Sequence, residues 1–423
     1  NIFDTAYARD KRALMAAINN VRSTGAAVDI DLPTIVVVGS QSSGKTSILE
    51  AISGVNLPRA VGTTTRTPTE VRSRQDVDVP WNAVVKIRHE GDSSFHNSLG
   101  PRPRSVSARI HDPNLVQIAV RRAQLAILNP SILLYRFLEY DIPAEPETNP
   151  LGSTRKLAFS NDVIVLEITG PQVTDLTLVD LPGLIQNVGE GEDKNNIQLV
   201  EDMVKSYISK DCLILLVITM KVDDIHNQKA VLLAREADPE GRRTAGVLSK
   251  ADSLRDKSER DQWLKVVKGQ REHLHYGYYV TRQPDADALA EGISFAKARA
   301  DEEAFFATQS PWSSLDIQYQ KRLGTKNLAE FLSDQLSKLI SRRLPDVEDK
   351  IAHRRRQLQT ELKSLGSEPS NNPLTTIDSL VTSFAAEIAK DVKGEAKHEA
   401  FLQALNAAAA DYKTAIKKTC PNF

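Results

Sequence analysis

Short apolar runs recur along the first two thirds of the chain and predict buried β-strands. Residues 35–38 and 212–218 are wholly apolar, and residues 163–168, 176–180 and 244–248 are mainly so. Runs of this length are typical of strands that are buried within a sheet. Helix-like stretches separate several of them, so the pattern predicts an α/β fold built on a mixed, mostly parallel sheet.

Apolar residues at helical spacing flank this region on both sides. Leu14, Ile18 and Val21 precede the first strand. The stripe that follows the last strand consists of Leu328, Phe331, Leu332, Leu336, Leu339 and Ile340. Neither stripe is expected to form a stable helix alone in water, so each must pack against something. Two arrangements fit equally: the helices pack together in a bundle, or each covers the α/β core.

The last part of the chain predicts further helices. Amphipathic spacing recurs in residues 347–365 and 380–392, and an alanine-rich helix is expected over 400–418. Pro311 and Pro345 punctuate the region before them. Because proline removes a backbone donor and disfavours helix at the preceding residue, each is expected to mark a boundary or a kink.

Residues 72–156 carry a weaker pattern. Residues 84–88 favour a strand and residues 116–138 favour a helix, with an arginine-rich segment, 103–109, between them. Nothing in this stretch has the chemistry of a particular ligand site. A helix and loop that cover the core are therefore favoured over a partner-binding site.

The candidate chemistry begins at Gly39-Ser-Gln-Ser-Ser-Gly-Lys45-Thr46, between a predicted strand and a predicted helix. This context is the one that a phosphate-binding loop requires, and a flexible glycine-serine turn needs neither the Lys-Thr pair nor both flanking elements. Backbone N–H groups are expected to surround a phosphate, Lys45 to reach the β and γ phosphates, and Thr46 to hold Mg²⁺. The candidate nucleotide-binding residues of this loop are Ser40, Gln41, Ser42, Ser43, Gly44, Lys45, Thr46 and Ser47.

Two later motifs indicate which nucleotide is bound. Asp180-Leu-Pro-Gly183 ends a strand, so Asp180 can hold Mg²⁺ through water and the Gly183 N–H can contact the γ phosphate. Ser249-Lys250-Ala-Asp252 ends another strand. The Asp252 carboxylate can accept hydrogen bonds from guanine N1–H and the 2-amino group, which adenine lacks, while the Lys250 stem lies along the base. The ordered series favours a guanine nucleotide.

These motifs together resemble the dynamin superfamily of large GTPases, in particular its fungal and Mx-like branches. The resemblance rests on residues 32–46, 57–68, 180–183 and 238–244, which span most of the first 345 residues. The Leu-Pro-Arg and Thr-Arg-x-Pro elements within 57–68 are not general features of small GTPases. The resemblance implies that the chain hydrolyses GTP to GDP and phosphate with Mg²⁺ and converts the cycle into movement of a helical bundle.

The resemblance also implies how water is activated. Ras-like proteins place a glutamine directly after the Asp-x-x-Gly turn, but Leu184 stands there in this chain. Gln41 matches the family residue that positions the attacking water, and Thr65 matches the first-switch residue that holds the water and Mg²⁺. The metal set is then Thr46, Thr65 and Asp180, and the catalytic set is Gln41, Ser42, Lys45, Thr65 and Gly183.

A monovalent cation, Na⁺ or K⁺, is implied to replace an arginine finger. Ser42 and the main-chain oxygens of Ala60 and Gly62 match its ligands in the family. Arg59 and Gly62 are counted among the nucleotide-binding residues. Arg59 and Arg66 are not assigned as fingers, because a loop-anchoring or solvent-facing role is favoured for a lone arginine.

Two loops leave alternatives open. Asp224 lies where the family has an acidic loop that contacts a second GTPase domain in trans, and a solvated turn is an equal alternative. The last guanine-recognition loop departs from the family pattern. Arg282 and Gln283 are the candidates there, and Asp285 either pairs with the nucleotide or is an ordinary turn residue.

The composition excludes some classes of function and adds no new candidate site. Lys and Arg number 54 and Asp and Glu 55, so a formal net charge of -1 gives no global signature of nucleic-acid binding. Cys212 and Cys420 are far apart and fit a reducing compartment. No apolar run approaches the roughly 20 residues that span a bilayer, so a cytoplasmic location is expected, with membrane contact only peripheral.

The resemblance divides the chain into four parts. These are a first bundle helix (1–28), a dynamin-type GTPase domain (29–310), a second bundle helix (311–345) and the start of a truncated helical stalk (346–423). The expected function is a mechanochemical GTPase, activated when GTPase domains pair, that serves membrane remodelling or polymer assembly on a membrane or cytoskeletal partner. A GTP-dependent scaffold and a monomeric switch with slow hydrolysis are the alternatives.

Overall fold

The computed structural model divides the chain into two compact units, residues 1–352 and 353–423. It describes residues 17, 18, 21, 32–58, 65–90, 104–139, 157–185, 193–221, 225–254, 256–365, 372–394 and 399–420.

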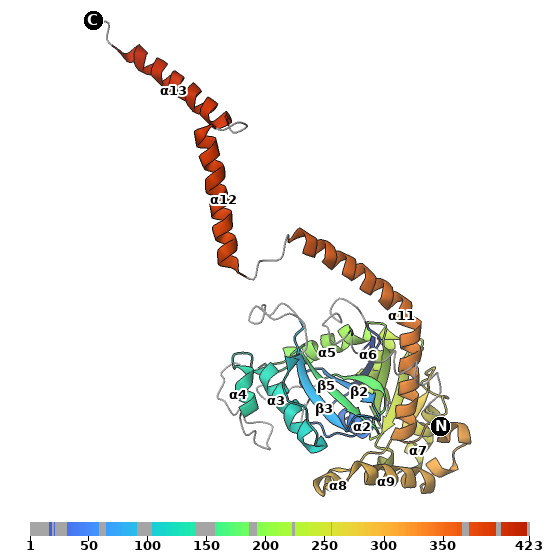
Figure 1. Cartoon of the computed structure of the whole chain (residues 1–423). Helices are drawn as coiled ribbons and strands as arrows, with labels where there is room; N and C mark the ends of the chain where they lie inside the picture. The colour runs from blue at the N-terminus through green and yellow to red at the C-terminus, as the bar shows by residue number, and fades with distance from the viewer. Residues whose placement is uncertain are drawn as a thin grey trace. The chain divides into compact units, whose positions relative to one another are not determined.

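A mixed sheet forms the centre of the first unit (Figure 1). In spatial order its described strands are β4 (Arg104–Ser105), β3 (Asn82–Arg88), β5 (Val163–Gly170), β2 (Thr69–Gln75), β6 (Leu176–Asp180), β1 (Ile35–Gly39), β7 (Leu213–Thr219), β8 (Thr244–Ser249) and β9 (Tyr278–Val280). The strands from β6 to β9 pair in parallel, as do β2 and β5. β2 is antiparallel to β6, and β3 is antiparallel to both β4 and β5. The prediction of a mixed, mostly parallel sheet is confirmed.

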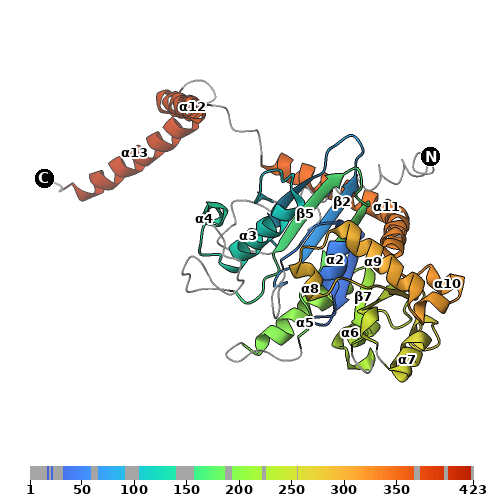
Figure 2. The ribbon, with the colours of Figure 1, turned by 90° about the horizontal axis from the view of Figure 1, so that it is seen from below.

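Helices cover both faces of this sheet (Figure 2). Ile35 and Val37 of β1 belong to a cluster with α2 (Lys45–Ser53), α3 (Val116–Leu128) and the first half of α11 (Thr325–Ser364). Val36 and Val38 face the other way. They belong to a second cluster, which includes residues of α5 (Asn195–Ile208), α6 (Lys229–Ala237) and α7 (Lys257–Val267). Burial on both faces explains why the central strands are continuous apolar runs.

Shorter elements complete the first unit. The helices are α4 (Leu134–Glu139), α8 (Ala286–Ala290), α9 (Phe295–Thr308) and α10 (Ile317–Gln320), and the 3₁₀ turns are Pro113–Leu115, Ile225–Asn227, Ala251–Ser253 and Trp312–Ser314.

The helix expected over 116–138 is two helices. α3 ends before Asn129, whose main-chain N–H and side-chain amide both donate to the carbonyl of Leu125. Pro130 follows, and a residue before proline is disfavoured in a helix. The single-helix prediction was therefore wrong, whereas the strand predicted over 84–88 is confirmed as part of β3.

Pro345 was expected to mark a boundary or a kink, and the boundary alternative was wrong. Pro345 lies inside α11, which begins at Thr325 and continues to Ser364. A proline inside a helix removes one hydrogen bond without requiring the helix to end. Between Pro311 and Thr325 the chain forms the 3₁₀ turn Trp312–Ser314 and the short helix α10, so this segment is not one continuous helix.

The apolar stripe of α11 packs on the sheet. Leu328, Leu332, Leu336 and Ile340 are buried in the same cluster as the β1 residues. Ile18, one of the three described residues near the amino terminus, is buried there too. This packing is the core-covering arrangement. The remaining residues of 1–28 lie outside the described residues, and the separate bundle stays a prediction.

The second unit is helical. α12 (Pro373–Lys393) and α13 (Ala400–Thr419) confirm the two helices predicted there. Several of their apolar side chains are exposed, including Leu380, Phe384 and Leu405. In the part of the chain that the structure describes, no helix combines the length and the apolar character needed to cross a membrane.

Candidate nucleotide-binding site

The loop between β1 and α2 has the backbone of an anion-binding turn. Gly44, at the amino end of α2, has φ of 95°, and Ser42 has φ of 61°. Left-handed residues in such a turn let successive N–H groups surround one anion. At the start of the loop, a Cβ on Gly39 would lie 2.7 Å from the Val217 carbonyl oxygen. Glycine is therefore required where the loop leaves β1.

Lys45 is held beneath this loop. Its Nζ donates to the carbonyl oxygens of Gly39 at 3.0 Å and Ser40 at 3.2 Å. Burial lowers the Lys45 pKa, and the nearby Asp180 carboxylate opposes that change. An ammonium group has three N–H donors, so one further donor can serve a phosphate oxygen.

The Asp-x-x-Gly turn lies directly against the phosphate loop. The Gln41 N–H donates to the Leu184 carbonyl at 3.1 Å, and the Leu184 N–H donates to the Gly39 carbonyl at 3.2 Å. A Cβ on Gly183 would lie 2.9 Å from the Gln41 Cα and 3.1 Å from the Lys45 Nζ. The structure thus brings Gln41, Lys45 and Gly183 together, and a side chain at position 183 would fill the space between them.

Asp180 is the centre of the predicted metal set. It is 1% exposed, and its Oδ2 accepts a hydrogen bond from the Thr65 hydroxyl at 3.3 Å. Burial raises the Asp180 pKa to about 6, against the opposing effects of Lys45 and of the Thr65 and Thr46 hydroxyls.

The residues around Asp180 fit a Mg²⁺ ion. The Asp180 Oδ1 is buried without a hydrogen-bond partner among the described residues. A buried carboxylate oxygen of this kind is costly unless a cation or a donor compensates it. Carboxylate and hydroxyl oxygens are the donors that Mg²⁺ prefers, so Asp180, Thr46 and Thr65 form a suitable set.

Ser249 and Lys250 connect the predicted base-recognition motif to the phosphate loop through hydrogen bonds. The Ser249 hydroxyl donates to the Ser43 carbonyl at 2.5 Å, and the Lys250 Nζ donates to the Ser42 carbonyl at 2.9 Å. Burial lowers the Lys250 pKa, and Lys221 adds to the effect. Asp252 follows at the same end of the site.

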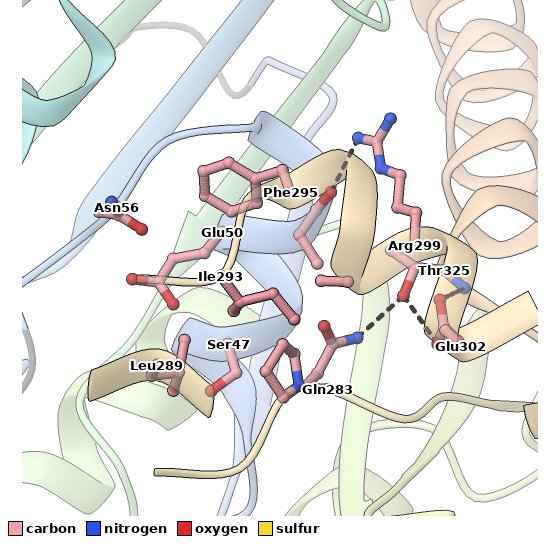
Figure 3. A pocket seen from close by; sticks show the side chains of 13 residues that line it. Ser47, Glu50, Asn56, Gln283, Leu289, Ile293, Phe295, Arg299, Glu302 and Thr325 are labelled. Carbon is pink, nitrogen blue, oxygen red and sulfur yellow. Dashed lines mark hydrogen bonds between the residues drawn. The ribbon is translucent and has the colours of Figure 1, made fainter. Parts of the chain in front are cut away.

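Arg282 forms an ion pair with Asp252, whereas the Gln283 side chain contacts Thr325. The Arg282 Nε lies 3.6 Å from the Asp252 Oδ2. The Gln283 side chain instead donates to the Thr325 hydroxyl at 2.8 Å (Figure 3). Asp285 accepts a hydrogen bond from the Ala288 N–H and caps α8, as its turn alternative expects. A role of Gln283 in base binding stays a prediction.

Several predicted residues lie outside the described part of the chain. They are Arg59, Ala60, Gly62 and Asp224, so their roles stay predictions. Arg66 is described. Its Nη1 donates to the Ala158 carbonyl at 3.3 Å, and its guanidinium lies 5.7 Å from the Phe159 ring centroid, which fits a loop-anchoring role.

Two buried carboxylates, Glu50 and Glu302, were not anticipated, and both line the pocket shown in Figure 3. Glu50 on α2 accepts a hydrogen bond from the Leu57 N–H at 2.8 Å, just before the first switch. Glu302 on α9 accepts one from the Arg282 N–H at 2.9 Å. For Glu302, the only sign of burial in the sequence is its position four residues before Phe306, since residues at this spacing share one face of a helix.

Comparison with known families settles the relationship that the motifs suggested. A model of the dynamin family matches residues 35–251, and a model of the dynamin central region matches residues 262–414. The chain belongs to the dynamin family. Its phosphate loop, Asp-x-x-Gly turn and Ser-Lys-Ala-Asp252 segment, apart from the final Asp252, fall within the first match.

The relatives of this dynamin-family chain include Mx proteins of fish. An interferon-induced GTP-binding protein Mx of Epinephelus coioides is 31% identical over 398 residues, which are 93% of this chain and 57% of the relative. The MxB protein of Danio rerio is 31% identical over 399 residues, 93% of this chain and 56% of the relative. The chain thus spans little more than half the length of the curated relatives it matches.

Proposed function

We propose that the chain binds GTP and hydrolyses it to GDP and phosphate. The observation that carries this proposal is the convergence of three separate sequence motifs on one loop. Gly183 lies against Gln41 and Lys45, and the Lys250 side chain is hydrogen-bonded to the Ser42 carbonyl. The matched Mx relatives are described as GTP-binding proteins, which supports the choice of nucleotide.

The proposed mechanism assigns one task to each group. Lys45 binds the β and γ phosphates, and Mg²⁺ held by Thr46, Thr65 and Asp180 would neutralise charge on their oxygens. Gln41 orients a water molecule for attack on the γ phosphorus. A new P–O bond forms while the bond from the γ phosphorus to the bridging oxygen breaks, and the water's proton leaves with the phosphate.

Base selection belongs to Asp252. Its carboxylate accepts from the guanine N1–H and 2-amino groups, and Arg282, whose Nε lies 3.6 Å from the Asp252 Oδ2, helps to hold that carboxylate in place. The Gln283 side chain donates to the Thr325 hydroxyl and so stabilises the loop that carries Arg282, and its contact with the base stays a prediction.

The remaining elements of the dynamin-type cycle extend this proposal. Ser42 and the main-chain oxygens of Ala60 and Gly62 would hold a monovalent cation, which would supply the positive charge that an arginine finger supplies in other GTPases. Asp224 contacts the site of a second chain when GTPase domains pair. Movement of the helices outside the GTPase domain then serves membrane remodelling or polymer assembly from the cytoplasm. A scaffold that uses hydrolysis as a timer and a monomeric switch are the rival functions.

The substitution Gln41→Ala tests the catalytic part of the proposal. We expect GTP turnover to fall by about 10²-fold, the size typical of losing one group that acts in the transition state. GTP affinity should change by less than about threefold, because Gln41 acts on water rather than on the nucleotide. The measurements are phosphate release and fluorescent-nucleotide binding, each in sodium and in potassium.

Gln198→Ala is the matched control, because Gln198 is an exposed glutamine on α5 that contacts only Asp202 among the interactions seen. It should leave both quantities unchanged. Equal turnover of the Gln41→Ala variant and the wild type would remove Gln41 from the mechanism, and equal affinity for GTP and ATP would refute the proposed function itself.

A further inference from the structure

One buried carboxylate lies between the base-recognition loop and the start of α11 (Figure 3). Glu302 is 4% exposed. Its Oε1 accepts hydrogen bonds from the Arg282 N–H at 2.9 Å and from the Thr325 hydroxyl at 3.1 Å, and its Oε2 accepts one from the Thr325 N–H at 2.9 Å. A single side chain of α9 therefore holds two segments that are distant in sequence.

Further hydrogen bonds join the same two segments. The Gln283 side chain donates to the Thr325 hydroxyl at 2.8 Å. The Val280 N–H donates to the Arg322 carbonyl at 2.9 Å, and the Gly324 N–H donates to the Val280 carbonyl at 2.8 Å. The residues that lead into α11 thus continue the sheet beyond β9. The loop that follows β9 and the first turn of α11 are fixed to each other as well as to Glu302.

The side chain of Arg282 extends these contacts to the proposed guanine site. Its Nε lies 3.6 Å from the Asp252 Oδ2, and its guanidinium lies 5.1 Å from the Phe305 ring centroid. Arg282 therefore contacts the base-recognition carboxylate with its side chain and Glu302 with its main chain. A continuous path runs from Asp252 through Arg282 and Glu302 to Thr325.

Electrostatics make Glu302 sensitive to both of its neighbours. A buried carboxylate is costly unless hydrogen bonds compensate it, and burial raises the Glu302 pKa against the opposing effect of its donors. Thr325 is the first residue of α11, where the unpaired N–H groups of a helix carry partial positive charge. Displacement of either segment would remove some of the donors that compensate the carboxylate, so the three groups are expected to move together.

We propose that Glu302 is a positioning residue that couples guanine binding at Asp252 to the first turn of α11. Bound guanine holds the Asp252 carboxylate in one position, and that carboxylate in turn holds the Arg282 side chain. Because Glu302 is hydrogen-bonded to both the Arg282 main chain and Thr325, a more ordered Arg282 also makes the first turn of α11 more ordered. The proposal rests on the proposed function, because it requires guanine to bind at Asp252.

Amide hydrogen exchange of the full chain, with and without GDP, tests the coupling. In the wild type, GDP should slow exchange in residues 39–47 and also in residues 325–332. In Glu302→Gln, GDP should still slow exchange in 39–47, but the effect on 325–332 should be lost, because an amide cannot accept from all three donors. We expect GDP affinity to fall by about tenfold, a typical size for one lost charge-assisted contact.

Glu303→Gln is the matched control, because Glu303 is the next residue of α9 and is exposed. It should behave as the wild type. The same GDP response of 325–332 in Glu302→Gln and the wild type would overturn the proposal, and so would the absence of that response in the wild type. If GDP also failed to protect 39–47 in the wild type, the proposed function would fail with it.

A second variant keeps the test decisive if Glu302→Gln does not fold, as judged by its thermal unfolding. Thr325→Val removes one hydroxyl donor and keeps the Thr325 N–H and the carboxylate. It should weaken the GDP response of 325–332, and Thr325→Ser should restore it. An undiminished response in Thr325→Val, or no rescue by Thr325→Ser, would contradict the coupling.

Discussion

The carboxylate of Asp252 decides which base the proposed site accepts. In Asp252→Asn, one acceptor oxygen becomes an NH₂ donor, which faces the 2-amino group of guanine but can pair with the 2-oxo group of xanthine. We expect GDP affinity to fall by about 10²-fold and the affinity for xanthosine diphosphate to rise, since the guanine 2-amino group would lose its acceptor and face a second donor. Competition binding with fluorescent GDP measures both.

Asp261→Asn serves as the control for this experiment, because Asp261 is an exposed acid on α7. It should leave both affinities unchanged. A variant at position 252 that kept its preference for GDP over xanthosine diphosphate would show that the base is recognised elsewhere.

At the scale of the elements, β2 shows that a buried strand can carry charged side chains when ion pairs compensate them. Glu70 is 3% exposed and is paired with Arg72 at 2.9 Å and with Arg88 of β3 at 2.6 Å. Removal of one member of a buried ion pair leaves an uncompensated charge, so Glu70→Ala should lower the free energy of unfolding by about 3 kcal/mol. Urea unfolding followed by circular dichroism measures the change.

Arg74→Ala provides the comparison on the same strand. Arg74 pairs with Asp76 at 3.2 Å, but its side chain is half exposed. Its removal should cost less than about 1 kcal/mol, because water screens an exposed pair. Similar losses of unfolding free energy in the two variants would mean that water screens the charge of Glu70 as well as that of Arg74.

The same strand explains why part of the fold was not predictable. β1 and β7 were predicted because their apolar runs signal burial on both faces without any knowledge of their neighbours. β2 contains Glu70 and Arg72, whose burial depends on partners from β3 and β5, and such pairing is invisible in a single sequence. Pro345 shows the same limit, because α11 continues through it, and a single sequence does not distinguish a proline that a helix tolerates from one that ends a helix.

The candidate site also contains residues that the sequence predicts and residues that only the structure reveals. Lys45, Asp180 and Gly183 belong to local motifs, in which residue type and spacing already imply the chemistry. The hydrogen bonds of Gln283 and Glu302 depend on where α9 and α11 pack, so they became known only from the structure.

At the scale of the whole molecule, the described site residues all belong to the first unit. The second unit has exposed apolar side chains on α12 and α13, such as Phe384 and Tyr412. Exposed apolar helix faces are prone to self-association. Two routes to assembly can therefore be proposed for one chain, through paired GTPase domains or through these helices, and they predict different kinetics.

GTP turnover per chain, measured against protein concentration, separates the two routes. We expect a steep rise for the full chain and for a chain that ends after Leu365, because pairing through the first unit needs neither α12 nor α13. Asp224→Ala should flatten the rise in both, while Asp202→Ala, at an exposed acid of α5, should not. A rise that disappears with the helices would favour the scaffold. A flat, slow rate in every variant would favour the monomeric switch, because an enzyme completed by a second copy must speed up as copies meet.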